Sequence, residues 1–567
     1  MTIDPLALDI QWNRLIHVVN EQAAALQRTS FTPVVRDAGD LSACVFDSRG
    51  CMMAQADTGT PGHINSMARC MRYVLREIPL DTMRPGDVFI TNDPWESSGH
   101  LHDITVVTPV FHPRRPHPVG FFVNCCHVVD IGGRGFGADA REVYEEGLAI
   151  PVMHLYRAGE PNRDLERIIG ANVREPELSL GDIHAQVVAN DVGARRLLDM
   201  MEEEGLDDLV PLADAIIERS ERAMRDALRR ITPGVYRNEV FSDGFDEPVR
   251  IAVAVTVGDG HVLVDFTGTS PESPHGINVV LNYTHAYTTY AFKCAVSPDV
   301  PNNEGSFRPI AITAPEGCIL NARRPRAVAA RHVLGHFIPA AIHGALAGVV
   351  PVMAEGAANI WAVQIQGDEG PEGRRPFTAL FFTAGGTGAR PRQDGLSSTA
   401  FPSGIRGVPV EIIETTAPLV VERKELRTDS GGPGRQRGGL GHSITIASVT
   451  GAPLALSAMY DRFDHPARGL EGGGAGEPGA LEVGGQRQRP KGRIGIPAGR
   501  SFTLHLPGGG GYGDPYERDP ERVCEDVRLG LVSPRAAREQ YGVVLTEKGE
   551  VDAEETARLR SARREQA

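Results

Sequence analysis

The spacing of apolar residues changes several times along the chain. Asp4-Pro5 has the form of a helix N-cap followed by proline at the first helical position, and apolar residues recur at helical spacing from there to Leu26. This pattern predicts a long opening helix. Further helical patterns cover residues 191–201, 209–231 and the alanine-rich segment 327–352.

Short apolar runs bounded by turn residues predict strands between these helices. The runs cover residues 42–46, 87–90, 104–107, 119–123, 251–257 and 261–266. Glycine and turn residues dominate from about 376 to 515, which predicts a further β-rich unit, and a helical tail begins near Asp519. The expected fold class is α+β, a mixed multi-domain architecture with β-rich units.

A chain of 567 residues is too long for one ordinary core, so several domain-sized units are expected. No internal repeat of fixed period is visible, which disfavours a solenoid or propeller. We predict four units: an N-terminal α+β domain over 1–232 that holds the candidate metal site, a central α/β domain over 233–375, a glycine-rich β domain over 376–515, and a helical tail over 516–567.

The overall charge narrows the function classes. A formal net charge of -15 and the absence of a basic stripe argue against nucleic-acid binding. The amino terminus lacks a signal-peptide pattern, and no run of about eighteen apolar residues occurs, so a cytoplasmic protein without membrane contact is expected. The eight cysteines form no CxxC pair and are expected to be buried thiols.

Potential metal ligands are densest between residues 92 and 130. His100 and Asp103 stand three apart in a loop that leads into a strand, and His127 ends the next strand. Antiparallel pairing of these strands would bring the three side chains together, and Asp40, just before an earlier strand, is the best fourth candidate. Imidazoles with carboxylates suit zinc, manganese, iron or nickel. Loop caps and salt bridges are the alternative interpretation.

Other catalytic motifs are disfavoured. None of the glycine-rich segments has the GxxxxGK[ST] form, so tight turns and close backbone approach are the preferred interpretation, and ATP would be bound mainly elsewhere. No GxSxG or HExxH motif accompanies suitable partners. Cys125 and Cys126 adjoin His127, but neighbouring strand residues point to opposite faces, which disfavours a catalytic thiol.

Several long motifs carry a resemblance to a known family. They include RPGDVFITNDPWESSGHLHDITVVTPVF (84–111), GDIHAQVVANDVGARRLL (181–198), PVEIIETTAPLVVERKELRTDSGGPGRQRGGLG (409–441) and LPGGGGYGDP (506–515). In this order, over nearly the whole chain, they resemble the hydantoinase B/oxoprolinase family. That family includes the B-type component of N-methylhydantoinase and a component of acetone and acetophenone carboxylases.

The resemblance implies a divalent transition metal, zinc, manganese or iron, in this chain. Carried over residue by residue, its ligands are Asp40, His100, Asp103 and His127. It also implies a hetero-oligomer with a hydantoinase A-type subunit that binds ATP and Mg. The chain departs from the family's usual pattern at Trp95, at His102 and just before His127, so His102 competes as a ligand or supports one. Asp130 is either an orienter of the His127 ring or a turn cap.

The function implied is ATP-dependent opening of a cyclic amide, a hydantoin or lactam. The partner would phosphorylate the carbonyl oxygen, and a metal-activated water in this chain would attack the same carbon, with Asp40 or Asp103 as catalytic proton acceptor. The alternatives are a ketone carboxylase subunit and a non-catalytic scaffold of the A-type subunit. Weaker pocket candidates are His63, otherwise a turn residue, Asn92, Asp93, Arg141 and Glu142, while Glu411 and Arg423 are interface candidates.

Overall fold

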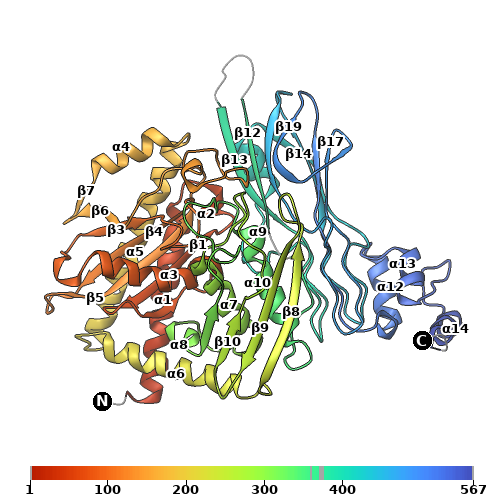
Figure 1. The fold of residues 1–567 in the computed structure, drawn as a ribbon, viewed down its shortest axis with the longest axis horizontal. Helices are drawn as coiled ribbons and strands as arrows, with labels where there is room; N and C mark the ends of the chain where they lie inside the picture. The colour runs from red at the N-terminus through yellow and green to blue at the C-terminus, as the bar shows by residue number, and fades with distance from the viewer. Residues whose placement is uncertain (1–2, 358–359, 369–375, 565–567) are drawn as a thin grey trace.

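The N-terminal part is organised around a seven-stranded antiparallel sheet (Figure 1). The computed structural model describes residues 3–357, 360–368 and 376–564. From edge to edge the sheet contains β2 (Met52–Gln55), β1 (Leu41–Asp47), β5 (Pro118–His127), β4 (Asp103–Phe111), β3 (Val88–Thr91), β6 (Met153–Arg157) and β7 (Glu160–Pro161). The strands predicted over 42–46, 87–90, 104–107 and 119–123 are therefore confirmed.

Helices cover both faces of this sheet. On one face, α1 (Pro5–Thr29), α5 (Pro176–Glu203) and α6 (Val210–Leu228) share a buried core with side chains of β1 and β5. On the other face, α3 (Pro61–Glu77) packs against alternate residues of the same strands. The Asp4 carboxylate accepts backbone N–H groups at the start of α1, which confirms the predicted cap. Two smaller helices are α2 (Pro33–Arg36) and α4 (Arg163–Asn172).

A second sheet of four strands follows in the central part. Its order is β11 (Ile310–Thr313), β10 (Val262–Asp265), β9 (Val249–Val257) and β8 (Gly234–Ser242), with β10 and β11 parallel. The strands predicted over 251–257 and 261–266 are confirmed. Beside this sheet lie α7 (Leu281–Val296), α8 (Glu304–Phe307), α9 (His332–Gly335) and α10 (Phe337–Leu346).

The prediction of one helical segment over 327–352 is wrong in its first part. Residues 327–331 form irregular turns, and the helical pieces α9 and α10 are short. The backbone N–H groups of Val328 and Ala329 donate to the buried carboxylate of Glu146, each at 2.7 Å, instead of to helical carbonyls. A tertiary contact has therefore overridden the helix propensity of the alanines.

Two further sheets build the β-rich part. One contains β13 (Pro376–Ala384), β12 (Ile360–Asp368), β16 (Leu454–Met459) and β19 (Lys491–Ile496). The other contains β14 (Leu419–Leu426), β15 (His442–Ser448), β20 (Phe502–His505), β17 (Ala480–Val483) and β18 (Gln486–Gln488), and the short helix α11 (Val410–Thr416) precedes β14.

Glycine-rich segments of this part pack backbone against backbone. A Cβ on Gly386 would lie 1.8 Å from the carbonyl oxygen of Gly439, and a Cβ on Gly509 would lie 2.0 Å from that of Thr387. The Gly432 N–H donates to the Gly509 carbonyl at 2.8 Å, and the Gly509 N–H donates to the Gly439 carbonyl at 2.9 Å. Only glycine fits such spacings. Close backbone approach, the interpretation preferred from the sequence for these segments, is confirmed.

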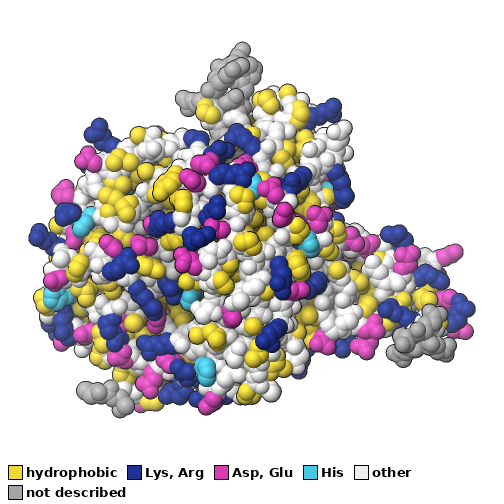
Figure 2. Space-filling view, viewed as in Figure 1, with side chains coloured by type: hydrophobic (Ala, Val, Ile, Leu, Met, Phe, Trp, Pro, Cys, Tyr) yellow, Lys and Arg dark blue, Asp and Glu magenta, His cyan; other side chains and the backbone are white. Residues whose placement is uncertain are grey.

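The chain ends in three helices that stand out from the body (Figure 1). They are α12 (Pro520–Arg528), α13 (Pro534–Tyr541) and α14 (Ala553–Arg564), and α12 and α13 share a small buried core of their own. The helical tail and the α+β fold class with several β-rich units are thus confirmed. Acidic and basic side chains are interspersed over the face drawn in Figure 2. Among the described residues, no helix combines the length and apolar character that a bilayer crossing requires.

Candidate metal centre

Strand register places Asp40, Asp103 and His127 at one end of the first sheet. Asp103 pairs directly with His127 between β4 and β5, and the His127 N–H donates to the backbone carbonyl of Asp40, just before β1, at 3.2 Å. Directly paired residues share a face of an antiparallel sheet. Cys125, two residues before His127 and so on the same face, packs in the core beneath α3. The three side chains therefore converge under α3.

Two other elements complete the cluster. His100 precedes β4 by three residues, and its Nε2 lies 2.6 Å from Asp103 Oδ1. His63 lies in the first turn of α3, and its Nε2 is 2.9 Å from Asp103 Oδ2 and 3.8 Å from Asp40 Oδ1. His127 Nδ1 is 3.1 Å from Asp103 Oδ1 and 4.0 Å from Asp40 Oδ2. Donor atoms of His100, Asp103 and His127 lie within 4.8 Å of one another, a spacing at which they could share one ion.

Asp103 is the electrostatic centre of this group. Its carboxylate also accepts from the guanidinium of Arg331, and both side chains are almost completely buried. Burial alone would raise the pKa of Asp103, but the neighbouring His100, His63 and Arg331 outweigh it and hold that pKa well below its usual range. Asp103 is therefore a carboxylate at neutral pH.

His100 faces this carboxylate as a neutral ring. Burial, together with the charge of Arg331, lowers the pKa of His100 to about 3. Its Nδ1 lies 2.8 Å from the carbonyl oxygen of Ala329 and 3.2 Å from Nη1 of Arg331, and its Nε2 faces Asp103 Oδ1. A neutral imidazole offers one lone pair to a metal ion, so this ring fits the role of a ligand beside the Asp103 carboxylate.

Several imidazole nitrogens that face away from Asp103 have no hydrogen-bond partner among the described residues. Among the described residues, His63 Nδ1, His127 Nε2 and both ring nitrogens of His102 are buried without a hydrogen bond. His102 stacks on His127 with ring centroids 5.3 Å apart, and burial, followed by the neighbouring His127 and His100, lowers its pKa well below the usual value. His102 therefore packs against a candidate ligand as a neutral ring.

The cluster lines a small cavity of about 20 Å³. Thr60 donates to Asp40 Oδ1 at 3.0 Å on one side, and His332 and His336 line another side, where α9 passes into α10. Apolar and aromatic side chains close it, namely Phe136, Tyr283, Ile360, Phe382 and Ile405. A cavity of this size accommodates an ion or one to two waters, not an organic substrate.

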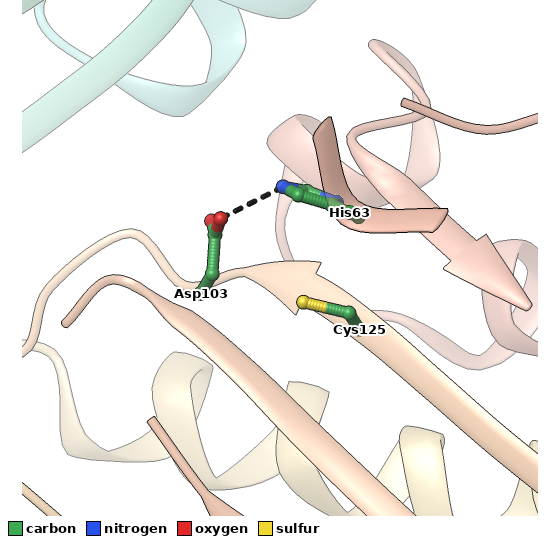
Figure 3. A group of neighbouring side chains, drawn as sticks. All are labelled: His63, Asp103 and Cys125. Atoms are coloured by element: carbon green, nitrogen blue, oxygen red, sulfur yellow. Dashed lines mark ion pairs between the residues drawn. The ribbon is translucent and has the colours of Figure 1, made fainter. Parts of the chain in front are cut away.

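Cys125 lies beside the cluster, and its sulfur lies within 4.8 Å of donor atoms of His63 and Asp103, a spacing at which the three could also share an ion. Figure 3 shows its sulfur close to the His63–Asp103 ion pair. Burial, followed by the charge of Asp103, raises the pKa of this thiol well above its usual value. Cys126 points to the other face of the sheet, into the core beneath α1. Cys126 and His127 therefore point to opposite faces, as predicted, whereas Cys125 shares the face of His127.

Of the weaker candidates, only His63 lines the cavity. The prediction that it is a turn residue is wrong, because Pro61 begins helix α3 instead of a turn. Asn92 is used structurally: its amide donates to the carbonyls of Leu101 and Leu148 and accepts from the Ile150 N–H.

The remaining candidates point elsewhere. Asp93 forms an ion pair with Arg324, and Arg141 contacts His275. Glu142 forms an isolated backbone β-bridge with Arg326. Asp130 accepts from the Gly132 N–H at 3.1 Å and pairs with Arg174 at 2.8 Å. It is therefore a turn cap, and the alternative role of orienting His127 is wrong, since His127 Nδ1 faces Asp103.

Sequence reasoning missed several residues of the cavity, among them Tyr283, Arg331, His332 and His336. The Arg331 guanidinium carbon lies 4.0 Å from the Tyr283 ring centroid, and the Tyr287 hydroxyl lies 3.0 Å from His336 Nε2. The RHVLGH sequence over 331–336 was a usable signal, because histidines four apart share one face of a helix.

Comparisons with known proteins identify the family of this chain. A family model described as Hydantoinase B/oxoprolinase matches residues 4–515. The chain is 31% identical to a Pseudomonas sp. (strain NS671) protein that is provisionally named as the B component of a D-/L-hydantoinase, over 98% of each chain. It matches the crystal structure of ATP-dependent caprolactamase from Pseudomonas jessenii with a TM-score of 0.89 at 26% identity, covering 99% of this chain and 100% of that chain.

A more distant structure shares the fold alone. The nucleotide-free acetone carboxylase structure matches with a TM-score of 0.86 at 20% identity, covering 99% of this chain and 83% of that chain. The family match spans most of the chain, and the hydantoinase-type relative is covered almost completely. This chain belongs to the hydantoinase B/oxoprolinase family.

Proposed function

We propose that this chain is the metal-bearing subunit of an ATP-dependent enzyme that opens a cyclic amide ring. The observation that carries the proposal is the convergence of Asp40, His100, Asp103 and His127 in one buried cavity, with the neutral His100 ring facing the Asp103 carboxylate. Imidazole and carboxylate donors together suit zinc, manganese or iron. A bound ion of this kind would polarise an amide oxygen and activate water for attack on the amide carbon.

Asp40 fits the role of proton acceptor better than Asp103. Asp103 is already engaged by three imidazoles and by Arg331. Asp40 accepts one side-chain hydrogen bond, from Thr60 to Oδ1, and lines the same cavity. A carboxylate with spare acceptor capacity beside the reacting water can take its proton. In this proposal Asp103 holds the imidazoles in place, while Asp40 receives the proton.

A neighbouring chamber supplies the space that a ring substrate needs. It has a volume of about 790 Å³ and shares two wall segments with the metal cavity. In the first segment Pro61 and Ile64 face the chamber while Thr60 and His63 face the cavity. In the second, 403–406, Gly404 faces the chamber. Substrate held in this chamber would therefore lie next to the metal cavity.

The proposed partner is an A-type subunit that binds ATP and Mg. One relative is named as the B component of a hydantoinase, and another structure is that of an ATP-dependent caprolactamase. The present sequence contains no GxxxxGK[ST] loop. Phosphorylation of the amide oxygen by the partner would make the carbon a better electrophile before water attacks. Carboxylation of a ketone has only fold-level support, from the acetone carboxylase structure.

Metal content and activity together test the proposal. The chain, as purified and after reconstitution with an A-type subunit, is assayed for ATP-dependent opening of hydantoins and lactams, with ketone plus bicarbonate as the competing reaction. Wild type is expected to carry one transition metal per chain, and His100→Ala and His127→Ala to lose both metal and activity. Arg163→Gln, which changes an exposed residue outside the cavity lining, is the control and should keep both. Ring-opening activity in a wild-type chain that contains no metal would contradict the proposal.

A further inference from the structure

A second cavity, of about 200 Å³, lies between α3, α7 and α8. On α3, Asn65, Arg69 and Arg72 line it at a spacing of four and then three residues, which places them on one helix face. His63, two residues before Asn65, projects from a different side of the helix into the metal cavity. The two cavities therefore lie on different sides of α3. We call the cavity lined by Arg69, Arg72 and Arg308 the arginine pocket.

Positive charge exceeds negative charge in the arginine pocket. Three guanidinium groups line it, those of Arg69, Arg72 and Arg308, against the single carboxylate of Glu304. Glu304 pairs with Arg72 at 2.8 Å. Arg308 donates at 3.2 Å to Glu221, which lies outside the lining. The lining itself carries a formal excess of two positive charges, three from arginine minus one from glutamate.

Arg69 is the least compensated of these groups. It is partly buried, and its Nε donates to the neutral Asn282 side chain at 2.8 Å. Among the described residues, no carboxylate forms an ion pair with Arg69. Burial accordingly lowers the pKa of Arg69 below its usual value. A half-buried guanidinium without a counter-ion is costly, so the pocket favours an anion near Arg69.

The pocket is open where its other arginines lie. The side chains of Arg72 and Arg308 are 64% and 47% exposed, so an anion can enter from solvent and meet Arg69 deeper inside. His285 lines the same space, and burial, together with the charges of Arg69 and Arg72, lowers its pKa to about 3. It is a neutral imidazole that can donate one N–H to an oxygen.

We propose that the arginine pocket binds a phosphate-class oxyanion, through Arg69, Arg72 and Arg308. A tetrahedral oxyanion supplies the counter-charge that Arg69 lacks, and its several oxygens can accept from guanidinium groups that approach from different elements. Inorganic phosphate and the phosphoryl group of an organic ester share this chemistry. The inference goes beyond ring opening at the metal centre and requires neither the metal nor the partner subunit.

Calorimetric titration of the full chain tests the site. The titrants are inorganic phosphate and methyl phosphate, with chloride at matched ionic strength as the blank. Wild type is expected to bind at least one of the two phosphates saturably with one site per chain. Arg69→Gln should weaken that binding at least tenfold, and Arg69→Lys should weaken it less, since it keeps the charge. Preference for inorganic phosphate identifies the free ion as the ligand, and preference for methyl phosphate identifies a phosphate ester.

Matched variants separate this site from general effects. Arg163→Gln changes a surface arginine that is 75% exposed and should bind phosphate as wild type does. His100→Ala should lose metal but keep phosphate binding, so failure at the metal centre and failure at the arginine pocket are distinguishable. Absence of saturable phosphate binding in wild type, or equal binding by folded Arg69→Gln, would overturn the inference.

Discussion

Arg331 and Asp103 form an ion pair with side chains that are only 4% and 0% exposed, although 228 residues separate them in the sequence. The guanidinium adds a permanent positive charge beside a carboxylate that otherwise contacts only imidazole rings. Removing one partner of such a pair leaves a buried charge alone and costs about 3–5 kcal/mol. A metal ion bound to the same carboxylate would take over part of that compensation.

Arg331→Gln is therefore expected to lower the melting temperature of the metal-free chain more than that of the metal-loaded chain. Thermal unfolding with and without a chelator measures the two shifts. Arg163→Gln, which breaks an exposed ion pair, should change the free energy of unfolding of either form by less than about 0.5 kcal/mol. Equal losses in the two forms would contradict the role given to Arg331.

Glu146 gives a pH-dependent prediction. Burial raises the pKa of Glu146 to about 8, against the opposing hydrogen bonds from Ala329 and Val328. The folded state therefore binds this proton more tightly than the unfolded state. The contribution to stability is complete below the ordinary pKa of the carboxyl, and it is lost as pH rises toward about 8.

Glu146→Gln keeps an oxygen that can accept the same two N–H groups but cannot ionise. The difference in melting temperature, variant minus wild type, should increase by several degrees from pH 6 to pH 8.5. Paired melting curves at the two pH values give this difference directly. Parallel pH dependence of wild type and variant would show that Glu146 stays ionised or titrates equally in both states.

Thr60 tests the role of Asp40. Thr60→Val removes the hydroxyl that donates to Asp40 Oδ1 while keeping a similar shape. Loss of that bond is worth about 1–1.5 kcal/mol, so kcat for ring opening should fall about tenfold with metal content unchanged. Thr415→Val, in exposed helix α11, serves as the control. Loss of metal with loss of rate would instead make Thr60 a support of the ligand set.

Gly335 tests the packing that supports Arg331. A Cβ at this position would lie 2.3 Å from Cε1 of Tyr283, whose ring stacks under the Arg331 guanidinium. Gly335→Ala should lower the free energy of unfolding by about 1–3 kcal/mol and reduce metal content. Gly407→Ala, where a Cβ meets no atom within 4 Å, is the matched control. Wild-type stability and metal content in Gly335→Ala would refute this account.

The parts of the site that follow from local order were predictable from the sequence. Asp103 and His127 lie on consecutive strands, and consecutive antiparallel strands pair, so their proximity follows from two short patterns. The same reasoning about strands, together with the family resemblance, predicts Asp40 as the fourth residue of the site. The assignment of these residues with His100 as ligands, and of Asp40 and Asp103 as catalytic groups, stays a prediction, as do the four domain boundaries and the interface candidates Glu411 and Arg423.

The parts that depend on distant packing were not predictable. Arg331 reaches Asp103 only because Glu146 and α7 hold the segment before α9 against the first sheet, and no local pattern encodes that contact. The turn alternative for His63 rests on Pro61-Gly62, two residues that favour turns, but proline also favours the first position of a helix, and here it begins α3. The alanine-rich segment over 327–352 predicted a helix where Glu146 captures the backbone.

The backbone packing around Gly509 also constrains the order in which the protein can assemble during synthesis. Segments near residues 387, 439 and 509 pack against one another there: the Gly439 N–H donates to the Thr387 carbonyl and the Gly509 N–H donates to the Gly439 carbonyl, each at 2.9 Å. The first of these contacts can form as soon as residue 439 has left the ribosome, whereas the second needs residue 509. Packing of this part is consequently completed only late in synthesis.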